Sequence, residues 1–288
     1  MFGDKNYYCL VAGLKEFALE AENKGFDAKE IVAEIRAELS RRDRGYLDLF
    51  YMYYDVENLV AVRSGRNRLS SLGNYSREEL EEELKSPKRL PKSMRQVIEA
   101  YNASEQDEVD EDEITIDTTE RFERSLFAAY YEECVHSRCG FLKAWSEFDR
   151  NIRNLTAALT ARRKGMTASE FVVGKDEIAK VLSRSSAVDF GLKGELDYID
   201  QVMAAVADNG NLMEKEHRID MIKWNMAEEL AIFDYFNING ILSYLVKINL
   251  VHRWTSLNAS YGKEMFEQLI LSFSGKEMIS AAEKRTEQ

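Results

Sequence analysis

The chain has 288 residues and a formal net charge of −12, and 45% of its residues are hydrophobic. The acidic balance argues against non-specific binding to nucleic acid or to an anionic membrane surface. No apolar run approaches the ~20 residues that are needed to span a bilayer. Only 2 prolines occur, against roughly 14 at average usage, and helix interiors exclude proline. Composition therefore predicts a mostly helical, soluble globular protein that can bury a core.

The first residues of the chain and its cysteines indicate the cellular compartment. The opening residues, Met-Phe-Gly-Asp-Lys, lack the charged and then apolar order that marks a secretion signal. Cys9, Cys134 and Cys139 are sparse and odd in number, which is typical of reduced thiols. We expect a cytosolic protein.

Several elements can be predicted in the first part of the chain. Tyr7 to Gly13 (YYCLVAG) is short and apolar, and we expect a buried strand or an extended arm there. Asp27 is a good N-cap for a following helix, and a second helix is expected from about residue 43 to residue 54. Ser76 with Glu79 forms a capping-box signature for a third helix.

The stretch Ser104–Glu113 (SEQDEVDEDE) is the one low-complexity segment. Like charges repel, so we expect an exposed, extended linker. We therefore predict that the chain is divided into a first helical subdomain at 1–103, an acidic linker at 104–114, a second subdomain at 115–200 and a third at 201–288. Later helices are expected around 141–164, 167–182, 195–207, 212–233, 238–251 and 259–271.

Comparison of the chain with itself indicates a repeat. Residues 55–62 (DVENLVAV), 151–159 (NIRNLTAAL) and 237–245 (NINGILSYL) share one pattern. It consists of Asp or Asn, Val or Ile, any residue, Asn or Gly, and then Leu or Ile. The repeated positions are Asp55, Asn58, Leu59, Asn151, Asn154, Leu155, Asn237, Gly240 and Ile241.

A short polar residue before an apolar run suits an N-cap or a tight bend. We therefore expect Asp55, Asn151 and Asn237 at equivalent helix starts or sharp bends, with the aliphatic residue four positions later buried in each copy. The copies are further apart than the 20–50 residues of common solenoid repeats, which favours three helical subdomains. The alternative is a chance likeness, because many helices begin this way.

Aromatic residues precede each copy, and the first two copies end in basic residues and a glycine. These features resemble the central-stalk family that comprises the C subunit of V/A-type ATP synthases and the d subunit of the eukaryotic vacuolar ATPase. The best match is Trp145–Gly165 (WSEFDRNIRNLTAALTARRKG). The opening NYYCLVAGL is similar to that of a bacterial group encoded with V-type ATPase subunits, in which Leu-Pro usually follows. In this chain Lys15 follows Leu14, so the proline is absent.

The resemblance implies an all-α fold. Three pseudo-repeated helical subdomains would surround a pseudo-threefold axis, with a short extended N-terminal arm. It also implies a subunit that transmits torque between the membrane rotor ring and the central stalk, with no catalytic residues and no cofactor. The expected partners are the rotor ring and the other central-stalk subunits. The expected location is cytoplasmic, peripheral to the inner membrane through protein contacts and without lipid insertion.

One pattern indicates a different class of function. Glu133 with His136, and Glu214 with His217, are both Glu-x-x-His pairs, and positions i and i+3 share one helix face. Two such pairs, with a Glu from each of two further helices, form the di-metal site of ferritin-like carboxylate oxidoreductases. Solvent-facing Glu–His pairs are the more common outcome in a chain rich in Glu. A helical adaptor unrelated to ATPases is a third possibility.

Three further patterns have an ordinary structural interpretation. Cys134, His136 and Cys139 lack the second Cys pair of a structural zinc site, so we expect buried thiols. Lys85–Arg95 (KSPKRLPKSMR) is either a contact for an acidic partner or, more commonly, a solvated loop and helix start. Tyr46–Tyr54 (YLDLFYMYY) is more often core than ligand site.

Overall fold

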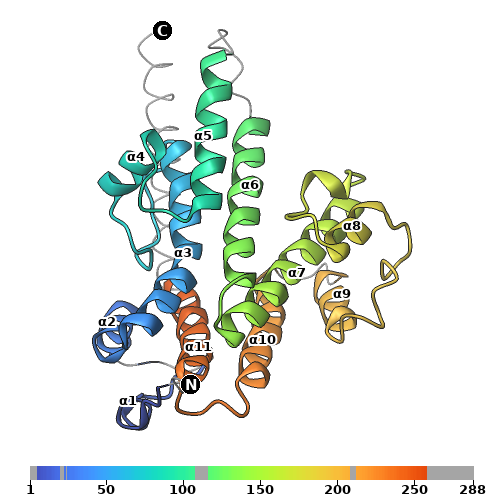
Figure 1. Ribbon diagram of the computed structural model, residues 1–288. Helices are drawn as coiled ribbons and strands as arrows, with labels where there is room; N and C mark the ends of the chain where they lie inside the picture. The colour runs from blue at the N-terminus through green and yellow to red at the C-terminus, as the bar shows by residue number, and fades with distance from the viewer. Residues whose placement is uncertain (1–4, 20–22, 24, 108–115, 208–211, 258–288) are drawn as a thin grey trace, which may run out of the picture.

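The computed structural model describes residues 5–19, 23, 25–107, 116–207 and 212–257. Over these residues it contains helices and no strands, which confirms the all-α prediction (Figure 1). None of the helices in this part of the chain is long and apolar enough to cross a membrane. The helices are α1 Tyr8–Gly13, α2 Ala28–Glu38, α3 Arg41–Arg63, α4 Arg77–Lys85, α5 Lys92–Asp107, α6 Ile116–Val135, α7 Gly140–Arg163, α8 Glu177–Arg184, α9 Ile199–Ala207, α10 Leu212–Leu230 and α11 Ile238–Ser256, with a 3-10 turn at Ala168–Glu170.

The helices pack in antiparallel neighbours around one apolar core (Figure 1). The α5–α6 hairpin lies beside α3, and the α10–α11 hairpin lies at the opposite end of the same bundle. α7 contacts α6, α10 and α11, while α8 and α9 cover its other side. Helices α6, α10 and α11 therefore converge on α7, while the aromatic run of α3 joins the core beside α6 and α11. Its Phe50, Tyr51 and Met52 are buried.

Side-chain caps begin several of these helices, as predicted. Asp27 accepts hydrogen bonds from the N–H groups of Lys29 and Glu30 at the start of α2. Ser76 and Glu79 form a reciprocal capping box at α4. Each cap satisfies backbone donors that have no partner within the helix.

The first two repeat copies share a structural unit. In α3, the Asn58 amide donates to the Ser70 carbonyl at 3.0 Å and accepts the Ser70 N–H at 2.7 Å. In α7, Asn154 makes the same pair of bonds with Val173, at 2.8 and 2.7 Å. We call these two contacts the loop clamps. A side-chain amide carries both an acceptor oxygen and donor N–H groups, so it can satisfy both backbone groups of one residue.

The ends of α3 and α7 match as well. Gly65 and Gly165 both have φ of 68°, a conformation that glycine adopts without steric cost. The residue after each glycine donates its N–H to an alanine carbonyl five residues back, at 2.8 and 2.9 Å. This is a Schellman end. Each loop then leads into a short helix with a side-chain cap, Ser76 for α4 and Asp176 for α8.

The prediction that Asp55 and Asn151 lie at helix starts or sharp bends is wrong. Both lie inside long helices, α3 and α7, because the aromatic residues that precede them are themselves helical. The returning loop satisfies the buried Asp55 carboxylate: Tyr75 N–H donates at 3.1 Å and Asn74 Nδ2 at 2.7 Å. Loop contacts thus stabilise a polar residue that a helix interior would otherwise disfavour.

The third copy differs from the other two, so equivalence of all three copies is not observed. Asn237 is the N-cap of α11, as predicted, and accepts the N–H groups of Asn239 at 2.9 Å and Gly240 at 3.3 Å. A Cβ at Gly240 would lie 2.0 Å from the Asp234 carbonyl oxygen. That close approach is the physical reason for Gly where the other copies have Asn. The prediction for the aliphatic positions is confirmed, because Leu59, Leu155 and Ile241 are all fully buried.

Two expectations about extended segments need correction. The N-terminal segment forms the short helix α1 and not a strand or extended arm, because a helical turn satisfies backbone groups that an unpaired strand would leave open. Residues 104–107 continue α5. The rest of the predicted linker, 108–114, lies outside the described residues. α6 packs against both α5 and α3. The helices on either side of the predicted linker therefore pack against each other.

Candidate functional site

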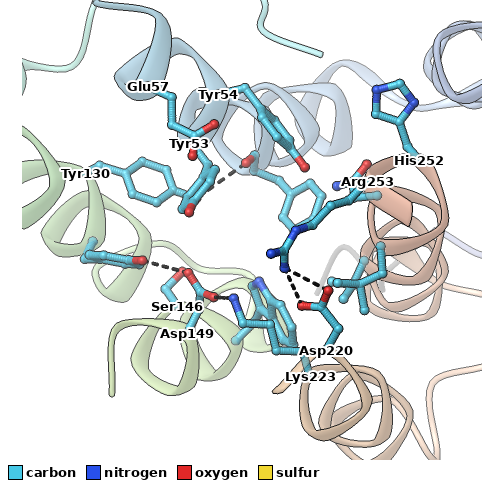
Figure 2. A pocket seen from close by; sticks show the side chains of 16 residues that line it. Tyr53, Tyr54, Glu57, Tyr130, Ser146, Asp149, Asp220, Lys223, His252 and Arg253 are labelled. Carbon is cyan, nitrogen blue, oxygen red and sulfur yellow. Dashed lines mark hydrogen bonds and ion pairs between the residues drawn. The ribbon is translucent and has the colours of Figure 1, made fainter. Parts of the chain in front are cut away.

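A cavity of about 510 Å³ lies among α3, α6, α7, α10 and α11 (Figure 2). A second hollow of about 570 Å³ shares part of its wall. The shared residues are Tyr53, Asp149, Asp220, Lys223 and Arg253. Four of these five carry a charge, so polar chemistry is concentrated where the central helices meet.

Lys223 of α10 and Asp149 of α7 form the central ion pair. Lys223 Nζ lies 2.7 Å from Asp149 Oδ1, and the Tyr131 hydroxyl donates to Asp149 Oδ2 at 2.7 Å. Burial alone would raise the pKa of Asp149, but the Lys223 ammonium and the Tyr131 hydrogen bond hold that pKa below its ordinary value. Asp149 is therefore ionised, and its charge is compensated across the α7–α10 interface.

A second ion pair fastens α10 to α11. One guanidinium nitrogen of Arg253 contacts both oxygens of Asp220, at 2.8 and 2.7 Å, and Trp254 Nε1 donates to the same carboxylate at 2.8 Å. Arg253 also pairs with Glu216. Burial raises the pKa of Asp220, and the charge of Arg253 opposes that shift only in part.

A third pair joins α6 to α7. Arg153 lies 2.6 Å from Glu123 and stacks over the Phe127 ring, with its guanidinium carbon 3.9 Å from the ring centroid. Together the three pairs connect α6, α7, α10 and α11. We call Lys223–Asp149, Arg253–Asp220 and Arg153–Glu123 the ionic brace.

Aromatic residues form much of the remaining cavity wall. Tyr53 packs against Phe127 and Tyr130, with centroid separations of 5.4 and 6.0 Å. Burial raises the pKa of the Tyr53, Tyr54 and Tyr130 hydroxyls, so these phenols stay neutral. These aromatic residues thus add apolar contacts around the ion pairs and no charge of their own.

Glu57 of α3 lies at the cavity wall (Figure 2). Desolvation raises its pKa, and the charge of Arg153 offsets that shift only in part. The residue is nevertheless exposed on one side, whereas Asp149 and Asp220 are buried. Glu57 is therefore the acid of this wall that solvent reaches most readily.

These groups suit a structural connection more than bond-making chemistry. The carboxylates of Asp149 and Asp220 are occupied by cations and hydrogen-bond donors. The nearby Ser146 hydroxyl donates to the Leu142 carbonyl at 2.6 Å, and burial raises the pKa of Cys134 to about 12. A reactive hydroxyl or thiolate needs an adjacent base or a lowered pKa, and neither residue has that setting.

The predicted metal-ligand pairs do not come together. Glu133 accepts the Ser93 hydroxyl at 2.6 Å, and the exposed His136 contacts the Glu132 carbonyl at 2.8 Å. Glu214 pairs with Arg218 at 2.5 Å. His217 lies edge-on to Trp254. Over the described residues, no group of three or more His, Cys, Asp or Glu side chains is arranged to hold a metal.

The prediction of buried thiols at Cys134 and Cys139 is confirmed. Cys134 and Cys139 are buried and Cys9 is exposed, and all three are free thiols. Burial raises the pKa of Cys139 to about 11. The basic run from residue 85 is partly neutralised within the chain, because Arg89 pairs with Glu79 at 2.5 Å.

Sequence reasoning did not single out the ionic brace. Lys223 and Asp220 lie in the run IDMIKW, where apolar residues flank each charge, and Asp149 follows an aromatic residue in WSEFD. A charge within an apolar helical stripe was the available signal, because such a residue faces the core and needs a partner.

Comparison with known proteins defines the family. No curated protein matches the chain. A family model described as "Protein of unknown function (DUF2764)" matches residues 4–275, nearly the whole length. The chain therefore belongs to this DUF2764 family.

Proposed function

We propose that this protein is a non-catalytic coupling subunit of a V/A-type rotary ATPase, which links the membrane rotor ring to the central stalk. The observation that carries the proposal is the duplicated unit in α3 and α7. It comprises a long helix, a loop clamp at Asn58 or Asn154, and a Schellman end at glycine. These units coincide with the motif copies that resemble the C and d central-stalk subunits of those complexes.

Two further features support the proposal, one for the duplicated unit and one for a mechanical role. The first is the distance along the chain from the clamping asparagine to the glycine that ends its helix. Asn58 lies seven residues before Gly65, and Asn154 lies eleven residues before Gly165. The difference of four residues is about one helical turn, so both clamps can face their loops. In addition, the ionic brace joins four helices through paired charges, of which Asp149 and Asp220 are buried, as expected for a part that must hold its shape under load.

The proposal includes the finer points of the resemblance. It places the protein at the cytoplasmic face of the membrane through protein contacts, with ion transport as the process served. It also keeps the division into subdomains at 1–103, 115–200 and 201–288 around a pseudo-threefold axis.

Purification from native membranes tests this function. A tagged chain should be extracted in mild detergent, and the proteins that accompany it identified and quantified. We expect the rotor ring and central-stalk subunits in fixed stoichiometry. Cells without the protein should retain ATP hydrolysis in the soluble sector but lose ion pumping. An ATPase complex that lacks this chain and still couples hydrolysis to pumping would overturn the proposal.

A further inference from the structure

The connection between α10 and α11 displays a cluster of large apolar side chains. Ile232, Phe233, Tyr235 and Phe236 are 54%, 90%, 66% and 40% exposed. Tyr8 of α1, 57% exposed, extends the cluster, because its ring centroid lies 4.7 Å from that of Phe236. We call these five residues the aromatic tip. It lies at the end of the bundle where α1 meets the α10–α11 turn (Figure 1).

The backbone beneath the aromatic tip is fastened from several sides. The Asp234 carboxylate accepts the side-chain amides of Asn237 at 2.5 Å and Asn239 at 3.1 Å. Tyr7 N–H donates to the Phe236 carbonyl at 2.6 Å. Gly240 allows the turn to pack closely on the start of α11. The turn is therefore built to hold these side chains outward.

Such a cluster does not serve the protein's own core. Single exposed apolar residues are ordinary, but a contiguous group marks a surface that another molecule covers. Aromatic residues dominate the binding energy of protein interfaces, because each buries a large area with few rotatable bonds. A side chain as exposed as Phe233 suits insertion into a partner's pocket.

Charge around the aromatic tip distinguishes between possible partners. Asp234 lies in the middle of the cluster, and Glu229 lies in the last turn of α10, three residues before Ile232. Insertion into lipid would carry the Asp234 carboxylate toward hydrocarbon, which is costly for an ionised group. An anionic bilayer surface would also repel a chain of net charge −12. A protein can instead offer an apolar pocket with basic residues at its rim.

We propose that the aromatic tip is a docking surface for a protein whose contact face is apolar at its centre and basic at its edge. This inference rests on the proposed function, under which that protein is the membrane rotor ring. Phe233 and Tyr235 are the central anchors. Glu229 lies at the rim and contributes electrostatic attraction during association.

Binding to the purified rotor ring of the V-type ATPase from the same organism, held in detergent, tests the surface. Phe233→Ser should weaken binding by at least about 30-fold, the change expected for loss of an anchor residue. Glu229→Lys should slow association and reduce its salt dependence. The matched control is Val188→Ser, because Val188 is 77% exposed and lies between α8 and α9. It should bind like the wild type, and all variants should keep the wild-type melting temperature.

The outcomes separate the two proposals. If the wild type and every variant bind the ring equally, the docking surface is wrong and the proposed function stands. If the wild type does not bind the ring, both are wrong. Phosphatidylcholine vesicles without protein form the third arm. Binding of the wild type to these vesicles that Phe233→Ser abolishes would identify lipid as the occupant and overturn the protein partner.

Discussion

Replacing Asn154 by alanine removes both hydrogen bonds that hold α7 to its returning loop. Val173 is 1% exposed, so water cannot take the place of the lost amide. Each buried backbone group that loses its partner costs ~1–3 kcal/mol. We therefore expect Asn154→Ala to lower the free energy of unfolding by about 2–6 kcal/mol.

The equivalent change at Asn58 should cost less. Its partner Ser70 is only half-buried, so solvent can satisfy part of what the amide provided. We expect Asn58→Ala to lower the free energy of unfolding by about 1–2 kcal/mol. The order of the two costs tests whether burial of the clamped residue sets the energy.

Urea unfolding followed by far-ultraviolet circular dichroism measures both changes, provided the denaturant slope stays constant. The control is Lys143→Ala, an exposed position on the same helix α7, which should shift stability by no more than ~0.5 kcal/mol. The reasoning fails if Asn154→Ala matches this control, or if Asn58→Ala proves the more costly of the two clamp variants.

Three further predictions concern a glycine, a carboxylate and the ionic brace. Gly240→Ala should lower the melting temperature by several degrees, because the new Cβ would lie 2.0 Å from the Asp234 carbonyl oxygen. Its control is Gly45→Ala, an exposed position inside α3 with nothing within 4 Å of the new Cβ, which should stabilise the fold by about 0.5–1 kcal/mol. Equal melting temperatures for the two variants would contradict the close approach at Gly240. Burial raises the pKa of Asp55 to about 6 in the folded chain, above ~3.9 when unfolded, so its contribution to stability falls as the pH rises from about 4 to about 6. Urea titrations should therefore find that the free energy of unfolding of Asp55→Asn rises relative to that of the wild type between these pH values. If the difference between the two free energies does not change with pH, the pKa of Asp55 is not raised. Lys223→Met leaves Asp149 without its cation and should cost about 3–5 kcal/mol, whereas adding Asp149→Asn should recover part of that loss; strictly additive costs would mean that the two residues do not interact.

The sequence was sufficient for features that depend on neighbours in the chain. Helical composition, the caps at Asp27 and Ser76, and burial of the repeated aliphatic residues all follow from local spacing and propensity. The predicted N-cap at Asn237 is confirmed for the same reason. Each of these features requires only the residues within one or two helical turns.

Features that depend on a distant partner were not predicted correctly. Asn154 reads as the start region of a helix, but its role is set by Val173, nineteen residues later. Likewise, the apolar neighbours of Lys223 indicate that it faces the core, but its partner Asp149 is set only when α10 packs on α7. Local patterns do not specify which charged residue meets which across helices, because that depends on how the helices cross.

The α10–α11 hairpin connects the aromatic tip to the ionic brace. Lys223 lies seven residues before the end of α10 at Leu230, about 10 Å along a helix that rises 1.5 Å per residue. A partner bound at the tip would therefore load both helices close to the paired charges of the ionic brace. Arg253 with Asp220 fixes α10 against α11, and Lys223 with Asp149 fixes that hairpin against α7. Apolar packing has no preferred direction, whereas charge-assisted hydrogen bonds hold one geometry. Paired charges at these two interfaces thus resist sliding of the helices, which is the property that the proposed coupling role would require between the aromatic tip and the core.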